Sequence, residues 1–195
     1  MQYHTLKIVG LTRKLPLIQV GRSTKIASFS ILGDVELVDK LALKMAKDLT
    51  KYKFDYLVGP EVKVVPLIQK IAEILGHKRF MVCRKSIKTY MTSPVIVKPL
   101  SHFPKHIKPL VLNGPDAKLL ENKKVAIIDD VLSTGVTMRM ISHLMEKVGA
   151  KVVVYSVAIK QGETFDKFDN LLHISTLPIF KDNHQLTTHQ LPHKV

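Results

Sequence analysis

VAIIDDVLSTGVT, residues 125–137, combines three signals within one short segment. Its first four residues are apolar, which is typical of a buried parallel strand. Two adjacent carboxylates, Asp129 and Asp130, follow at the carboxyl end of that strand, where open α/β sheets bind ligands. A Ser/Thr/Gly loop comes next, and a 3.6-residue apolar period predicts a helix from about Thr137 to Lys147. The segment therefore predicts a ligand site at the edge of a parallel sheet.

The same segment has the parts that a sugar phosphate needs. Backbone N–H groups and hydroxyls of the loop, at the N-terminus of a helix, can hold an anion. The two carboxylates can accept hydrogen bonds from sugar hydroxyls or bind a hydrated Mg²⁺. The alternative interpretation is an ordinary strand–turn–helix unit in which the aspartates only cap the helix.

Strands and helices alternate along the chain, which predicts an α/β fold with a mostly parallel central sheet flanked by helices. Amphipathic helices are expected from Asp34 to about Leu49 and from about Val65 to Leu75. The expected strands are the short apolar runs 56–58, 80–83, 110–112, 125–128, 151–158 and 171–174. We expect one domain over residues 1–195, with its core at about 34–160.

Residues 86–108 have no convincing period and contain Pro94, Pro99 and Pro104. A segment of this length without regular structure is unusual inside a compact domain, and it is then often a functional loop. We therefore predict a flexible loop over about 86–108.

The composition favours a globular cytoplasmic protein. Hydrophobic residues make up 46% of the 195 residues, but no apolar run is long enough to span a bilayer. The N-terminus lacks the pattern of a signal peptide. Cys83 is the single cysteine and lies in an apolar stretch, so we expect a buried side chain rather than a nucleophile.

The net charge of +14 is compatible with two kinds of partner. A basic surface can bind nucleic acid, or its field can attract a small polyanionic substrate. No acidic residue occurs between Glu73 and Asp116, so the positive charge is concentrated around one segment of the sequence, next to other candidate phosphate ligands. The basic residues in this interval are Lys78, Arg79, Arg84, Lys85, Lys88, Lys98, Lys105 and Lys108. No RNA-recognition or zinc-finger pattern accompanies them, so nucleic acid is the less favoured partner.

The segment 125–137 resembles the signature of type I phosphoribosyltransferases, which bind 5-phosphoribosyl-1-pyrophosphate (PRPP). The resemblance implies that Asp129 and Asp130 contact the ribose hydroxyls. It also implies that the loop after them binds the 5′-phosphate through Ser133, Thr134, Gly135, Val136 and Thr137.

Gly59-Pro60-Glu61-Val62-Lys63 is similar to the pyrophosphate loop of adenine phosphoribosyltransferases, Gly-x-Glu-Ala-Arg-Gly. Lys63 stands at the arginine position of that motif, and Val64 stands at its last glycine. The resemblance implies that Glu61, Val62 and Lys63 bind PRPP. It also implies a cis peptide bond near Glu61–Val62, as is frequent in loops of this family.

Arg84-Lys85-Ser86-Ile87-Lys88 resembles the family's Arg-Lys-x-x-Lys motif. In related dimeric enzymes, basic residues here reach pyrophosphate, partly across the subunit interface. The resemblance therefore implies a homodimer in which Arg84, Lys85 and Lys88 contact PRPP, with Lys85 and Lys88 joining Asp129 and Asp130 as catalytic residues.

Taken together, these matches imply a purine phosphoribosyltransferase of purine salvage, whose cofactor Mg²⁺ is bound with PRPP rather than directly by the protein. Ser133 stands where hypoxanthine-guanine enzymes usually have an aspartate, so adenine is the favoured base. The resemblance places base recognition in a hood formed by about residues 5–33 and 160–185, with Arg13, Phe29 and Lys160 as candidates. The alternative is a non-catalytic PRPP-sensing regulator of purine metabolism that binds nucleic acid.

Overall fold

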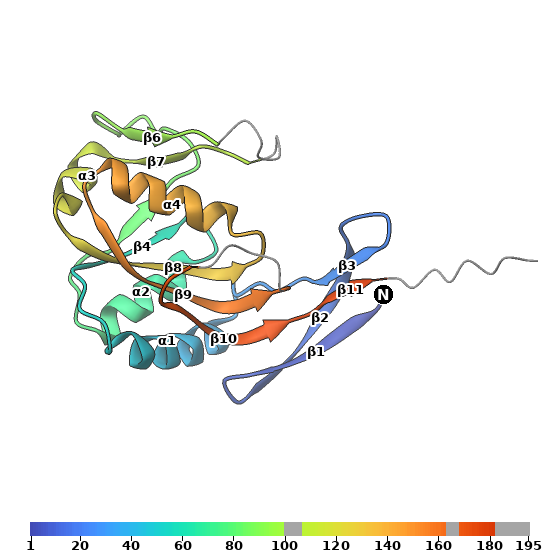
Figure 1. The fold of residues 1–195 in the computed structure, drawn as a ribbon. Coiled ribbons are helices and arrows are strands. Elements are labelled where there is room, and N and C mark those ends of the chain that lie inside the picture. Colours follow the sequence, from blue (N-terminus) through green and yellow to red (C-terminus); the bar gives the residue numbers. More distant parts are fainter. Residues whose placement is uncertain (100–106, 163–167, 182–195) are drawn as a thin grey trace, which may run out of the picture.

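The computed structural model describes residues 1–99, 107–162 and 168–181. Residues 100–106 of the predicted loop, including Lys105, lie outside the described residues, as do residues 163–167 and 182–185 of the predicted hood. Figure 1 shows a central sheet between helices and a smaller sheet that extends to one side of it.

In the part of the chain that the structure describes, five strands form the central sheet in the order β10-β9-β8-β4-β5, and all neighbouring pairs are parallel. This confirms the predicted fold. From β4 the chain moves to the edge strand β5 and later returns as β8 on the other side of β4, so the direction of winding reverses between β4 and β8. Ligands bind outside the carboxyl ends of the strands at such a point. The strands are β4 (Tyr56–Pro60), β5 (Met81–Cys83), β8 (Lys124–Leu132), β9 (Lys151–Gln161) and β10 (Leu171–Leu177).

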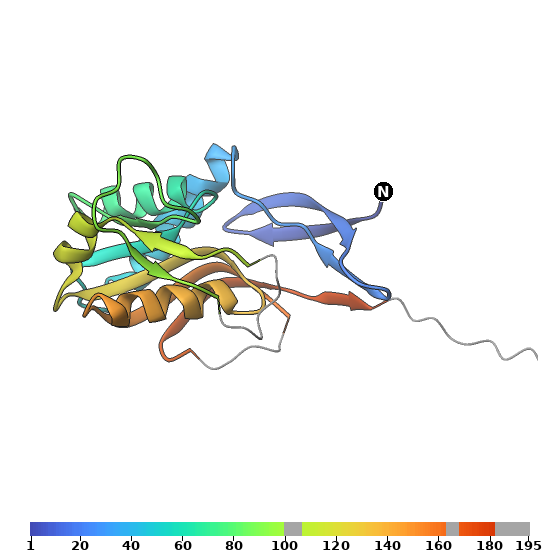
Figure 2. The same cartoon turned by 90° about the horizontal axis from the view of Figure 1, so that it is seen from above.

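Helices cover both faces of the central sheet (Figures 1 and 2). Ala126 and Ile128 of β8 pack on the face of α1 and α2, whereas Val125 and Ile127 pack on the face of α3 and α4. Successive side chains of a strand point to opposite faces, so a strand buried on both faces needs a continuous apolar run. None of the described helices is both long and apolar enough to cross a bilayer. The helices are α1 (Val35–Leu49), α2 (Val65–Ile74), α3 (Gly114–Leu120) and α4 (Val136–Lys147).

The smaller sheet combines segments from both ends of the chain. Its four strands within the described ranges are antiparallel and run in the order β1-β2-β3-β11. The sheet is curled, because the rings of His4 in β1 and Phe180 in β11 have centroids 5.4 Å apart although these strands form its two edges. Gln161 at the end of β9 donates a 3.0 Å hydrogen bond to the carbonyl of Ala27 and so joins the two sheets. The strands are β1 (Tyr3–Ile8), β2 (Leu11–Gln19), β3 (Thr24–Ala27) and β11 (Ile179–Lys181).

The prediction of a long segment without regular structure at 86–108 was partly wrong. Strand β6 (Val95–Val97) lies in this segment and pairs antiparallel with β7 (Leu110–Leu112). Its β-branched side chains pack against the core under α3 and α4, and Lys147 of α4 donates a 3.0 Å hydrogen bond to the carbonyl of Ile96. Tertiary contacts therefore order a run that the surrounding prolines had obscured.

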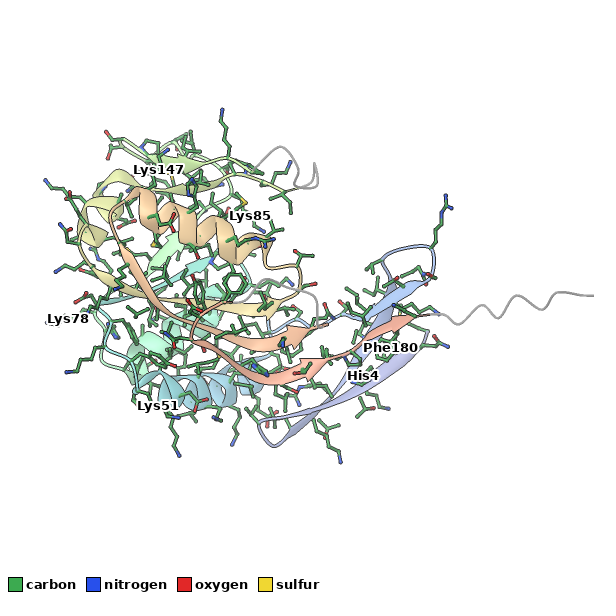
Figure 3. All side chains as sticks on the ribbon, in the orientation of Figure 1. His4, Lys51, Lys78, Lys85, Lys147 and Phe180 are labelled. Carbon is green, nitrogen blue, oxygen red and sulfur yellow. The ribbon has the colours of Figure 1, made fainter. Side chains whose placement is uncertain are left out.

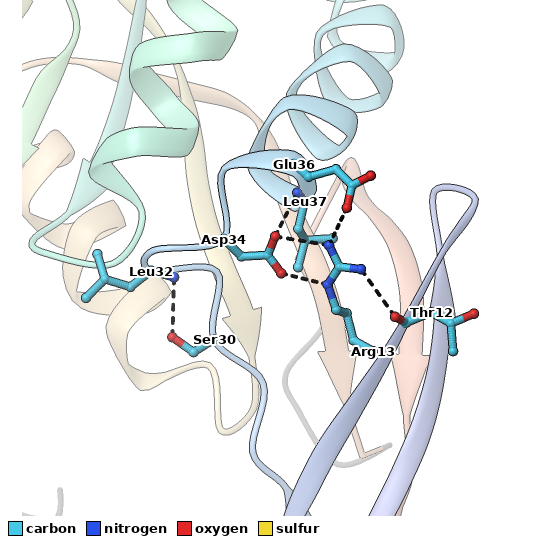
Figure 4. Close-up of polar contacts among 7 residues, drawn as sticks. All are labelled: Thr12, Arg13, Ser30, Leu32, Asp34, Glu36 and Leu37. Carbon is cyan, nitrogen blue, oxygen red and sulfur yellow. Dashed lines mark hydrogen bonds and ion pairs between the residues drawn. The ribbon is translucent and has the colours of Figure 1, made fainter.

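An ion-pair cluster fixes the small sheet to the start of α1 (Figure 4). Asp34 caps the helix, because its carboxylate accepts the amide N–H of Leu37 at 3.1 Å. Arg13 of β2 donates to the same carboxylate at 2.7 Å and to Glu36 at 2.8 Å. These donors lower the pKa of Asp34, with the bond to Arg13 as the largest cause.

We expect Asp34→Ala to destabilise the protein by about 1 kcal/mol at pH 7, since a lost N-cap typically costs roughly 0.5–2 kcal/mol. Because its pKa is lowered in the folded chain, the ionised Asp34 carboxylate stabilises the fold at pH values above the ordinary aspartate pKa. This stabilisation is lost as the pH falls from that value through the lowered pKa of the folded state. The difference from the wild type, measured by urea unfolding, should therefore shrink toward pH 3.

Asp39→Ala is the matched control for this measurement, because Asp39 also lies on α1. Its side chain is 51% exposed, and its ion pair with Lys70 is long, at 3.9 Å. It should change the stability by less than about 0.5 kcal/mol. An equal loss in both variants would argue against the cap.

Candidate functional site

Strands β4 and β8 end side by side at the carboxyl edge of the central sheet. The pairing of the two strands ends at Val58 and Ile127. Gly59 permits the close approach there, because a Cβ at this position would lie 2.8 Å from the carbonyl oxygen of Ile128. Lys63, in the loop after β4, places its Nζ 3.6 Å from Oδ2 of Asp130 on β8. The structure therefore brings the first two predicted motifs together at the ends of these two strands.

The two aspartates are both buried, but they have different neighbours. Asp129 lines a small cavity of about 80 Å³ together with the residues of the Ser/Thr/Gly loop. Asp130 instead faces Lys63. This difference follows from their adjacent positions on one strand, since adjacent side chains point to opposite faces.

The strand end supplies hydrogen bonds to part of each carboxylate. Oδ1 of Asp129 accepts the amide of Asp130 at 2.8 Å, and Oδ1 of Asp130 accepts the amide of Val131 at 3.0 Å. Oδ2 of Asp130 is buried and has no hydrogen-bond partner among the described residues. A buried carboxylate oxygen without a donor is available to a ligand hydroxyl or a hydrated cation.

Burial raises the pKa of Asp129 well above its ordinary range, and the negative charge of Asp130 adds to this effect. Lys63 acts in the opposite direction. The site therefore holds a carboxyl group that ionises less readily than an exposed aspartate. A shifted pKa at a strand end, beside a Ser/Thr/Gly loop that opens a helix, is typical of a functional site.

The loop after the aspartates turns the chain directly into α4. Gly135 is the residue before the helix and has a φ of +76°, a conformation that side chains with a Cβ rarely adopt. The ring of Phe168 lies against it, with Cε2 only 3.2 Å from where a Cβ would be. Free N–H groups at a helix N-terminus favour an anion. Phe168 was not predicted from the sequence, because it belongs to no motif and contacts the loop only in the folded chain.

Glu61 lies between the second and third predicted motifs. Its carboxylate accepts the amide N–H of Lys85 at 2.6 Å and forms an ion pair with Arg84. Its own amide donates to the carbonyl of Cys83 at 2.9 Å. Glu61 is thus placed to position the loop and the basic segment relative to each other. The peptide bond between Glu61 and Val62 is cis, as predicted.

The basic motif follows β5 at the same edge of the sheet. Arg84 exchanges two backbone hydrogen bonds with Val111, at 2.8 and 2.7 Å, which ties the motif to β7. Lys88 donates a 2.7 Å hydrogen bond to the hydroxyl of Ser86. Lys85 is exposed on this side of the molecule (Figure 3). All three predicted motifs therefore lie at the carboxyl edge.

The basic interval, although continuous in the sequence, is divided between two edges of the central sheet. Lys78 and Arg79 precede β5, whereas Arg84 and Lys85 follow it. Because β5 crosses the sheet, these two pairs lie at opposite edges. Lys78 and Arg79 therefore have no part in the site formed by the three motifs.

The three candidate base-binding residues are dispersed. Arg13 is engaged by Asp34 and Glu36, as described above. Phe29 is 6% exposed and belongs to the core on the face of α1 and α2. Lys160 is half-buried near the carboxyl end of β9, in register with Leu132 of β8 and with β10. Base binding by these residues stays a prediction.

Two further observations concern reactive groups. Cys83 is fully buried, and burial raises the pKa of its thiol to about 12, in agreement with the predicted non-nucleophilic role. Across the ranges 1–99, 107–162 and 168–181, no group of three or more His, Cys, Asp or Glu side chains is arranged to hold a metal ion.

Comparison with known proteins gives a family match over most of the chain. Residues 30–188 match the family described as the phosphoribosyl transferase domain. An orotate phosphoribosyltransferase of Methanosphaera stadtmanae is 23% identical over 166 residues, which cover 80% of this chain and 82% of that protein. An adenine phosphoribosyltransferase of Caldicellulosiruptor saccharolyticus is 33% identical over 122 residues, which cover 60% of this chain and 66% of that protein.

A solved structure has the same fold. The crystal structure of adenine phosphoribosyltransferase from Thermoanaerobacter pseudethanolicus aligns with a TM-score of 0.65, at 20% sequence identity. The alignment covers 83% of this chain and 95% of that one. At this identity the likeness concerns the fold, whereas the choice of base must be argued from the site.

We expect Asp129→Asn to raise the stability of the protein at pH 8. The raised pKa means that the folded chain holds a proton that the unfolded chain releases from about pH 4 upward. Ionisation of Asp129 therefore destabilises the fold as the pH rises, and asparagine removes this effect. Unfolding in urea at pH 3 and pH 8 checks this, and the gain should be absent at pH 3. A loss of stability at pH 8 would contradict it.

We expect Gly135→Ala to destabilise the protein by more than Gly10→Ala. Both glycines have a φ near +80°, so each alanine should cost about 1 kcal/mol in backbone conformation. A Cβ at Gly10 meets no atom within 4 Å, whereas a Cβ at Gly135 meets the ring of Phe168. The difference between the two variants in chemical denaturation measures this contact. Equal losses would show that the ring of Phe168 can move aside without a cost in stability.

Proposed function

Since the chain belongs to the phosphoribosyltransferase family, we propose that it transfers the 5-phosphoribosyl group of PRPP to a purine base, with adenine favoured. One observation carries this proposal. A buried acidic pair at the end of β8 leads directly into an anion-binding loop at the N-terminus of α4, at the point where the winding of the sheet reverses.

In this proposal each part of the site binds one part of PRPP. Residues 133–137 bind the 5′-phosphate through their backbone N–H groups and hydroxyls. Asp129 and Asp130 accept hydrogen bonds from the ribose hydroxyls. Lys63, Arg84, Lys85 and Lys88 face the pyrophosphate, and Glu61 positions the segment that carries three of these cations.

The reaction breaks the bond between ribose C1 and the pyrophosphate oxygen and forms a bond from C1 to a ring nitrogen of the base, which loses its proton. Positive charge develops at C1 as negative charge develops on pyrophosphate, so catalysis depends mainly on positioning and charge stabilisation. Lys63 contributes positive charge to both the ribose and the pyrophosphate parts of the site, because it belongs to the pyrophosphate loop and its ammonium lies beside Asp130.

The site is suited to Mg²⁺ bound together with PRPP. Oδ2 of Asp130 is the buried oxygen described above, and carboxylate oxygens are preferred by hydrated Mg²⁺. Without a cluster of three ligating side chains among the described residues, most of the ligands would come from PRPP and water. When bound, the ion supplies positive charge to the leaving pyrophosphate.

Two observations bear on the base. The adenine relative of Caldicellulosiruptor saccharolyticus has the higher identity, and Ser133 supplies no carboxylate at the position that hypoxanthine-guanine enzymes use. The orotate relative matches a larger share of the chain, so orotate is the second candidate. Orotate differs from adenine by carrying a carboxylate, which a site must neutralise with a cation. We place base recognition in a hood formed by the small sheet and the end of β9, and we propose that the enzyme acts as a homodimer.

Incubation with Mg-PRPP and an equimolar mixture of adenine, hypoxanthine, guanine, xanthine, uracil and orotate tests the function. We expect mass spectrometry to detect adenosine monophosphate as the dominant nucleotide. Orotidine monophosphate would move the assignment to orotate. Absence of any nucleotide with folded protein would favour the PRPP-sensing regulator.

A binding measurement separates these outcomes. We expect Asp129→Asn combined with Asp130→Asn to reduce PRPP affinity at least about tenfold in calorimetry, because two ligand contacts are lost. Asp39→Asn combined with Asp48→Asn changes the charge equally on the surface of α1 and should leave the affinity unchanged. Equal affinity in both double variants would remove the acidic pair from the site.

A further inference from the structure

Two adjoining hollows lie at the edge of the central sheet opposite the candidate site. They measure about 480 and 430 Å³ and share Asp55 and His77 in their walls. The loops that precede β4, β5 and β8 form them, so they lie at the amino ends of the strands. We call them together the basic groove, after the cations that line it: Lys53, Lys78, Arg79, Lys123 and Lys124.

Positive charge dominates the basic groove. Its five cations are all exposed, and Asp55 is the single carboxylate among its described lining residues. That carboxylate already accepts the amide N–H of Lys124 at 2.8 Å. Of the five cations, Arg79 alone has an ion-pair partner in the described ranges, namely Asp116 at 3.7 Å. Figure 3 shows Lys51 and Lys78 at the end of the molecule away from His4 and Phe180.

Helix dipoles offset only part of this positive charge. The C-termini of α1 and α2 lie beside the groove and contribute roughly half a negative charge each. Together they offset about one of the five cations. Lys124 also lies in register with Lys151 on β9, and like charges on neighbouring strands destabilise a sheet. The fold therefore gives no reason for this excess of positive charge in the groove.

Flat aromatic side chains lie among these cations. The rings of Phe54 and His77 are stacked, with centroids 5.2 Å apart and planes at 9°. Tyr52 and Tyr56 also line the groove. All four residues are half-buried, and Tyr52, Phe54 and Tyr56 pack in part against the two cores. Cations that attract phosphates, combined with rings on which bases stack, are the chemistry that binds single-stranded nucleic acid.

We propose that the basic groove binds single-stranded nucleic acid. The strand lies across the amino edge of the central sheet, with its phosphates near the lysines and its bases beside Phe54 and His77. Since this edge is opposite the carboxyl ends of β4 and β8, the basic groove and the candidate site can be occupied together. The inference does not depend on the proposed catalytic activity.

Fluorescence anisotropy with a labelled oligouridylate of about 12 nucleotides, within the usual range of site sizes, tests the charge. We expect Lys78→Glu combined with Lys123→Glu to weaken binding at least about tenfold. The slope of log affinity against log salt should fall by about 1.4, since each phosphate contact on a single strand contributes about 0.7. Lys7→Glu combined with Lys14→Glu makes the same change of charge on the small sheet and should weaken binding less than about twofold. Equal losses would overturn the proposal.

A second variant tests the role of the bases. Phe54→Leu keeps an apolar side chain but removes the stacking ring, so it should weaken oligouridylate binding at least about fivefold. It should leave the binding of inorganic polyphosphate of similar length unchanged. His77→Ala provides the same test if Phe54→Leu lowers the melting temperature. Unchanged oligouridylate binding, or an equal loss for polyphosphate, would show that the groove is only a polyanion surface.

The same preparations separate this inference from the enzymatic proposal. Lys78→Glu combined with Lys123→Glu should form nucleotide from Mg-PRPP at the wild-type rate, because neither residue lies at the carboxyl edge. Loss of nucleic-acid binding with retained turnover supports two independent sites. A parallel loss of both would overturn their separation.

Discussion

Strand β8 is buried on both faces along its apolar half and then carries two carboxylates where its pairing with β4 ends. The helices on both faces fix the position of this strand, so the carboxylates cannot move toward solvent without disturbing two cores. Burial is what raises the pKa of Asp129, and the alternation of the strand is what separates the surroundings of Asp129 and Asp130. The loop to α4 then begins from a rigid point, which suits a site that must hold a phosphate in a fixed place.

The sequence predicted best what depends on local pattern. The run Val125–Ile128 determines the buried half of β8, and the apolar stripe that begins after Asp34 determines α1; the structure has both elements. The parallel direction of the strands in the central sheet followed from their alternation with helices. The three motifs lie at one edge of the sheet because each follows a parallel strand at its carboxyl end.

What the sequence could not provide depends on contacts between distant segments. Strand β6 is stabilised by β7 and by Lys147, which is 51 residues further along the chain. Phe168, which lies between β9 and β10 in the sequence, contacts Gly135 only in the folded chain. Glu61 has a positioning role that appears once Arg84 and Lys85 are placed beside it. The absence of acidic residues between Glu73 and Asp116 does not show by itself that β5, the strand expected at 80–83, divides the basic interval between two edges of the sheet.

The strands of the small sheet are synthesised at widely separated times. Strands β1, β2 and β3 are synthesised well before β11, which comes from residues 179–181. At a translation rate of roughly 5–20 residues per second, β3 waits on the order of ten seconds for its edge partner. During that interval the edge that later pairs with β11 presents free backbone groups, which are a common starting point for association between chains. The contact between His4 and Phe180 needs both segments, so closure of this sheet reports that both ends of the described fold have come together.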